Sequence, residues 1–189
     1  MANHMTTYVT VANLNEPAFN KLMELVYPPK GKYNIESVEV VNRLFQTDYS
    51  VEEKRFPDFA WMVDNVGSKW IEIECDDEPV FDTEYSFRVT SAWHVPEEYL
   101  LTLTEELVDI KNDVVVYGTY EDESYDPIGA FVYADDYEDS ENLDIDIDFD
   151  QLWEDDDYRN SIFDELEMLK ENLYDSYLEH LLDIQETKI

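Results

Sequence analysis

Patterns of apolar and polar residues predict strands in five stretches of the chain. Residues 69–75 and 82–93 alternate between apolar and polar positions, which is typical of strands that bury one face. Residues 6–14 are rich in β-branched and aromatic residues, as strands are. The predicted strands cover residues 6–14, 69–75, 82–93, 114–120 and 128–133. The last two read as a hairpin around a polar loop.

Apolar residues at helical spacing predict helices between and after these strands. Asn15 is a candidate N-cap, with Pro17 tolerated in the first turn, and Gly67 is a candidate helix terminator. The predicted helices cover residues 16–26, 57–66, 96–108 and about 152–184. Residues 37–45 fit either a short helix or a strand.

The order of these elements, β-α-(α)-β-β-α-β-β, predicts an α+β fold. With the first extra helix treated as an insertion, it contains the split β-α-β repeat of a ferredoxin-like sandwich. We expect a ferredoxin-like antiparallel sheet with helices on one face, plus an acidic loop (134–151) and a long C-terminal helix. Residues 1–133 would form the ferredoxin-like α+β core. Residues 134–189, the acidic strand or loop and the helix, would pack as part of the same domain.

Composition narrows the class of protein. The chain has 189 residues, of which 44% are hydrophobic, and holds 14 Tyr, 9 Phe and only 4 Gly. It is therefore long enough and apolar enough to fold, despite an acidity that often accompanies disorder. The lone Cys75 excludes an internal disulfide and a multi-cysteine zinc site. With no signal peptide and no long apolar stretch, we expect a soluble cytoplasmic protein without a membrane anchor.

Negative charge is concentrated in the second half of the chain. The net charge is −35, and residues 112–158 contain no Lys or Arg but 18 acidic residues. Such a field repels nucleic acid and acidic membranes and attracts cations or basic protein surfaces. Direct nucleic-acid binding is therefore not expected.

The sharpest local pattern is Asn-Leu-Asp-Ile-Asp-Ile-Asp-Phe-Asp at residues 142–150. As a strand, it would place four carboxylates on one face and four apolar side chains on the other. The start resembles an EF-hand calcium loop, but Phe149 stands where Gly is required and Asp155 where a bidentate Glu is required. We therefore predict no metal site.

Motifs that carry catalysis are not recognisable. There is no Gly-rich phosphate loop or dinucleotide fingerprint, and the histidines, His4, His94 and His180, are scattered. Carboxylate pairs are so common in this chain that they single out no acid–base site. The sequence thus predicts neither an enzyme nor a cofactor.

The predicted C-terminal helix carries a long apolar stripe. It includes Ile162, Leu166, Leu173 and Tyr177, with Leu178 and Leu182 widening it. Such a stripe is typical of packing against the core. At 1.5 Å per residue the helix would span about 50 Å, more than a small sheet covers, so a homodimer or another partner at part of the stripe stays open.

Three short stretches resemble a family of phage and mobile-element proteins of unknown function with a ferredoxin-like fold. They are Met1-Ala2-Asn3-His4, Asn65-Val66-Gly67-Ser68-Lys69-Trp70 and Thr90-Ser91-Ala92-Trp93-His94-Val95-Pro96. The family has Asn-Trp-Gly-Thr-Lys-Trp and Thr-Ala-Trp-Ser-Pro-Pro at the last two, so the match is partial. The acidic part resembles phage inhibitors that mimic DNA. The resemblance implies the fold and a phage origin, and no catalytic residue.

Together these observations predict a non-enzymatic phage accessory protein that mimics DNA. It would block the basic nucleic-acid-binding site of a host defence, restriction or transcription protein in the cytoplasm of an infected bacterium. The alternative is an acidic interaction or structural module whose charge serves solubility. The predicted aromatic anchors are Tyr133, Tyr137, Trp153 and Tyr158. The predicted partner-binding carboxylates, called the acidic surface below, are Asp135, Asp136, Glu138, Asp139, Glu141, Asp144, Asp146, Asp148, Asp150, Glu154, Asp155, Asp156 and Asp157.

Overall fold

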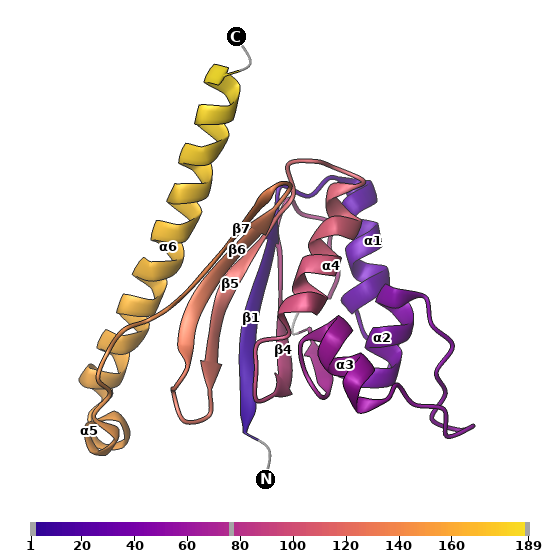
Figure 1. The fold of residues 1–189 in the computed structure, drawn as a ribbon, viewed down its shortest axis with the longest axis horizontal. Helices are drawn as coiled ribbons and strands as arrows, with labels where there is room; N and C mark the ends of the chain where they lie inside the picture. The colour runs from indigo at the N-terminus through magenta and orange to yellow at the C-terminus, as the bar shows by residue number, and fades with distance from the viewer. Residues whose placement is uncertain (1–2, 76–77, 188–189) are drawn as a thin grey trace.

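A seven-stranded antiparallel sheet in the order β2-β3-β4-β1-β5-β6-β7 organises the protein (Figure 1). The structure is a computed structural model that describes residues 3–75 and 78–187. The α+β class is confirmed, and the sheet is larger than the five strands that the sequence predicts. The strands are β1 (His4–Ala12), β2 (Asn34–Glu36), β3 (Ile71–Glu74), β4 (Tyr85–Ala92), β5 (Val115–Asp122), β6 (Ile128–Ala134) and β7 (Tyr137–Asn142).

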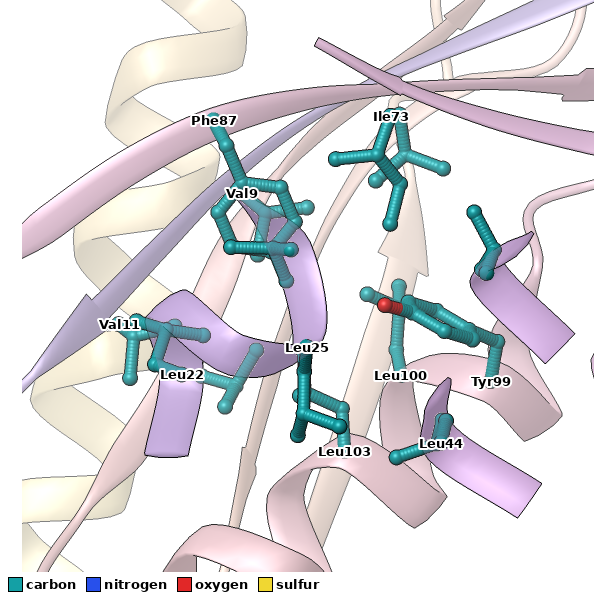
Figure 2. Packing of buried hydrophobic residues seen from close by; sticks show 14 of the residues in the cluster. Val9, Val11, Leu22, Leu25, Leu44, Ile73, Phe87, Tyr99, Leu100 and Leu103 are labelled. Carbon is teal, nitrogen blue, oxygen red and sulfur yellow. The ribbon is translucent and has the colours of Figure 1, made fainter. Parts of the chain in front are cut away.

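Four helices cover one face of the sheet (Figure 1). They are α1 (Glu16–Val26), α2 (Ser37–Phe45), α3 (Phe59–Val66) and α4 (Glu97–Val108). Residues 37–45 are therefore a helix, and the short edge strand β2 directly before it was not predicted. Figure 2 shows the resulting core, in which Val9 and Phe87 of the sheet face Leu22 of α1 and Leu100 of α4.

The opposite face of the sheet is covered in part by the C-terminal helix α6 (Asp156–Thr187). Leu173 and Tyr177 of α6 pack with Val115, Ala130 and Val132 of β5 and β6. The helices predicted between the strands therefore share one face, and the predicted C-terminal helix, for which no face was predicted, lies on the other. Because both faces of β5 and β6 are apolar, each face needs its own cover.

Residues 134–151 are more ordered than the predicted loop. They contain the edge strand β7, which pairs with β6 from Ala134↔Tyr137 to Gly129↔Asn142, and the start of α5 (Phe149–Glu154). Asp155 separates α5 from α6 with an extended conformation, at φ −122° and ψ 104°. The predicted single helix over 152–184 is thus two helices, because the chain turns at this residue.

The stretches that carry the family resemblance meet at one end of the sheet, apart from Met1 and Ala2, which lie outside the described residues. The Ser68 hydroxyl accepts a hydrogen bond from the Ala92 amide and donates to the Ala92 carbonyl, at 2.9 Å each. The Trp93 amide donates to the Asn3 carbonyl at 3.0 Å. Gly67 has φ +77° and lies against the backbone of α4, so a Cβ there would be both strained and crowded.

Candidate interaction surface

The first part of the acidic surface is the edge strand β7 and the turn before it. Asp135 and Asp136 form the turn and are exposed, as are Glu138 and Glu141 on the strand. Side chains alternate along a strand, so Glu138 lies on the α4 side of the sheet and Glu141 on the α6 side. β7 ends the sheet, so this edge is lined by carboxylates on both faces.

The second part is the extended segment 143–148, which runs down along α6 to α5 (Figure 1). Leu143, Ile145 and Ile147 are half-buried and pack against a cluster that includes Leu152 and Ile162. The aspartates between them, Asp144, Asp146 and Asp148, are exposed. The predicted alternation is therefore present as far as residue 148.

The prediction of a strand with four carboxylates on one face is wrong beyond that point. Segment 143–148 is extended but belongs to no strand, and helix α5 begins at Phe149. The Asp148 carboxylate accepts hydrogen bonds from the amides of Asp150 and Gln151, at 3.1 and 3.2 Å, and so caps this helix. Phe149 is 46% exposed instead of facing the core.

The third part is formed by α5 and the first turn of α6. Asp155 caps α6, because its carboxylate accepts hydrogen bonds from the amides of Asp157 and Tyr158, at 2.9 and 3.1 Å. Negative charge at this position also complements the helix dipole. The exposed carboxylates of this part are Asp150, Glu154, Asp155, Asp156 and Asp157.

Almost no counter-charge lies within the acidic surface. Over the described residues, the only ion pair that involves one of its carboxylates joins Asp156 to Arg159. Several bases elsewhere pair with carboxylates outside the acidic surface, as Lys21 does with Glu106 at 2.8 Å and Arg43 with Glu39 at 2.6 Å. The surface therefore presents its charge to solvent or to a partner.

The four predicted aromatic anchors differ in how they are placed. Trp153 is 65% exposed, in an edge contact with Tyr125 at 6.3 Å between ring centroids. Tyr158 is half-buried, and its hydroxyl accepts a hydrogen bond from the Asp148 amide at 3.0 Å. Tyr137 is half-buried against Tyr177 of α6. Of these three, Trp153 presents the most surface to a partner.

Tyr133 is the anchor that the structure contradicts. Its side chain is 2% exposed and belongs to the core between the sheet and the helices. Burial, reinforced by the nearby Glu97 carboxylate, raises the pKa of its hydroxyl. The residue points inward because alternate residues of β6 face opposite sides of the sheet.

An unpredicted pocket of about 470 Å³ adjoins the second part of the surface. Its walls come from the β5–β6 hairpin loop, including Tyr125 and Pro127, and from the extended segment, including Asp144 and Asp146. Asp126 adds a carboxylate from the hairpin. No sequence pattern links residues 125–128 with 142–147, so only the fold reveals this pocket.

Among the described residues, no three or more His, Cys, Asp or Glu side chains are grouped so that they could hold a metal ion. No helix in the described part of the chain is long and apolar enough to span a bilayer. The surface offers charge and exposed rings, which suit binding of a basic partner.

The apolar stripe of α6 is mostly used within the fold. Ile162, Leu166, Leu173 and Tyr177 are buried, whereas Leu178 is 41% and Leu182 60% exposed. Core packing thus accounts for most of the stripe, and a homodimer through the exposed leucines stays a prediction.

Comparison of the chain with protein-family models, curated proteins and solved structures found no match.

Proposed function

We propose that the protein is a non-enzymatic mimic of nucleic acid that occupies the basic DNA- or RNA-binding site of another protein. The observation that carries this proposal is the acidic surface: a set of exposed carboxylates on three adjoining parts of the chain, with one local ion pair among the described residues. Such a surface would bind a groove lined with Arg and Lys, because each carboxylate takes the place of a nucleic-acid phosphate.

The geometry sets a limit on how DNA-like the surface is. At roughly 3.3 Å per residue, the segment from Tyr137 to Asp148 spans at most about 40 Å. A duplex of that length carries about 24 phosphates, at one charge per 1.7 Å of axis. The carboxylates of this row are fewer, so mimicry depends on the added charges of α5 and α6. It also depends on the field of a chain whose net charge is −35.

We further propose a ferredoxin-like core of phage origin beneath this surface. Strands β3-β4-β1-β5 lie side by side in the sheet and are joined through α1 and α4, the arrangement expected for a split β-α-β repeat. In this view β2, β6 and β7 extend the sheet, and the chain from β7 through α5 to the first turn of α6 adds the acidic surface. The target would then be a host defence, restriction or transcription protein in the bacterial cytoplasm.

The test starts from a partner captured from bacterial lysate and eluted with competing duplex DNA, and then measures affinity with defined variants. Asp144, Asp146 and Asp150 are reversed together to Lys. Asp148 and Asp155 are left unchanged, because both cap helices and their loss would disturb the fold. We expect affinity to fall steeply with salt and to fall further in the triple variant.

A charge-matched control separates the effect of the acidic surface on affinity from the effect of the total net charge. Glu24, Asp64 and Asp109 are exposed on the helix layer, so their reversal to Lys changes the net charge equally at another site. Equal loss of affinity in both triple variants would show that only total charge matters, as expected for the alternative of an acidic module whose charge serves solubility. Salt-independent affinity would also refute mimicry.

A further inference from the structure

A second cavity lies away from the acidic surface, where α6 meets the part of the sheet that it leaves uncovered. Its volume is about 340 Å³, at the small end of the range for small-molecule sites. The sheet contributes Tyr8, Thr10, Thr119 and Glu121, and α6 contributes residues that include Phe163. One wall is thus rich in hydroxyls, and the other combines the apolar Phe163 and Leu166 with the charged Glu167 and Lys170.

Glu121 is the unusual member of this lining. One carboxylate oxygen, Oε1, accepts a hydrogen bond from the Tyr8 hydroxyl at 3.3 Å. The other, Oε2, is shielded from solvent and has no hydrogen-bond partner among the described residues. Burial raises the pKa of this carboxyl, while the bond from Tyr8 lowers it. A shielded carboxylate oxygen without a donor is costly. Because Oε2 is shielded, a ligand in the cavity would meet the carboxylate at Oε1, whose bond from Tyr8 is long and exposed.

The nearest cation in the cavity is already engaged. Lys170 lines the cavity from α6, and its ammonium forms an ion pair with Glu167 one turn earlier on the same helix. Its side chain is 24% exposed and so lies along the cavity wall. Glu121 therefore keeps no cationic partner that the described residues provide.

The lining selects the chemistry of the ligand. A metal ion would need several oxygen ligands, and the described residues form no such group. Phe163, which is half-buried, and Leu166, which is 4% exposed, offer contact to an apolar body. Hydroxyls of Tyr8 and Thr10 can accept further hydrogen bonds from a donor.

We propose that this cavity binds a small organic ammonium ion, whose charged head pairs with Glu121 and whose apolar body lies against Phe163 and Leu166. The site is distinct from the acidic surface and does not depend on mimicry. A basic side chain of a partner protein shares the head-group chemistry. The two-walled cavity between β1, β5 and α6 favours the small molecule.

The experiment is an NMR titration of the full chain at about 0.15 M salt, which weakens general attraction of cations to the acidic protein. The probes are phenethylammonium and hexylammonium, with uncharged 2-phenylethanol as the comparison. The variants are Glu121→Gln and, as a control with the same charge change at an exposed neighbour, Glu123→Gln. We expect saturable shifts at the Thr119 amide and Leu166 methyl groups, and about tenfold weaker binding in Glu121→Gln but not in Glu123→Gln.

Each contrary outcome overturns the proposal. Equal affinity in the two Gln variants, or equal affinity for 2-phenylethanol, would mean that the shifts report diffuse association. Response to an oligoarginine peptide at Glu121, with none to either ammonium probe, would assign the cavity to a protein side chain. Lys170→Met supplies a last check: weaker ammonium binding in this variant would contradict a site in which Lys170 takes no part.

Discussion

Truncation of Leu173 tests whether α6 is held to the sheet by its apolar stripe. Leu173 is 5% exposed and packs with Val115, Ala130 and Val132. Replacing a buried Leu by Ala costs about 2–5 kcal/mol, through lost burial and the cavity left behind. Because its surroundings are well packed, we expect the free energy of unfolding of Leu173→Ala to fall by about 3 kcal/mol.

Urea denaturation followed by tryptophan fluorescence and far-UV circular dichroism measures this change. For an m-value of roughly 2–3 kcal/mol/M, a loss of about 3 kcal/mol lowers the midpoint by about 1–1.5 M. Leu182→Ala is the matched control, since Leu182 lies on the same helix and is 60% exposed. It should change the stability by less than about 0.5 kcal/mol.

Unfolding of the two variants at the same urea concentration would refute this expectation. Equal midpoints would mean that α6 contributes nothing to the cooperative unit and that its contacts with β5 and β6 do not stabilise it. A fluorescence transition that stays in place while the helical signal melts earlier would show α6 detaching separately. That result would also contradict the expected loss of global stability.

Three further variants probe a cap, a titrating group and a close backbone approach. Asp155→Ala should lower stability by about 1 kcal/mol through loss of the α6 cap, measured by thermal melting against Glu154→Ala, which removes the same charge without a capping bond. Burial raises the pKa of Glu121 above its ordinary 4.5, so the stability that this group contributes is complete below pH 4.5 and is lost as pH rises through the folded-state pKa. Urea unfolding of wild type minus Glu121→Gln should therefore give a difference that falls with rising pH, whereas Glu123→Gln should give none. Gly118→Ala should cost at least about 2 kcal/mol in the same assay, because a Cβ there would collide with a backbone carbonyl of β1.

Specific results would contradict these expectations. Equal melting temperatures for Asp155→Ala and Glu154→Ala would remove the cap from the argument. A difference between wild type and Glu121→Gln that grows with pH would mean that the folded protein favours the carboxylate. Unchanged stability of Gly118→Ala would show that β1 and β5 can separate to admit a side chain.

Local sequence signals correctly predicted where two helices begin or end. The Asn15 cap is confirmed, since its side chain accepts a hydrogen bond from the Ala18 amide at 2.9 Å. Gly67 ends α3 in the left-handed region as predicted. Three caps were missed because aspartate is so frequent here that Asp58, Asp148 and Asp155 did not stand out. Asp155 does have the sequence context of a cap, preceding Asp156 and Asp157 in the first turn of α6.

The sequence of β5 already indicates that the second face of the sheet is covered by another element. Val114, Val115 and Val116 are consecutive and all fully buried. Val114 and Val116 belong to the main core, and Val115 belongs to the cluster under α6. A continuous apolar run of this kind is typical of a strand buried on both faces. The run therefore indicates a cover on each face of β5, whereas the sequence prediction assigned no face to the C-terminal helix.

The sequence by itself determined the charge of this protein, the alternation in residues 143–148 and most helix boundaries, because each depends on residues close together in the chain. Only the tertiary structure decided that Tyr133 is buried, that α6 lies over β5 and β6, and that Glu121 lines a cavity with α6. These outcomes depend on which segments meet across the sheet. Strand pairing and helix packing join residues far apart in sequence, and no local pattern specifies those partners.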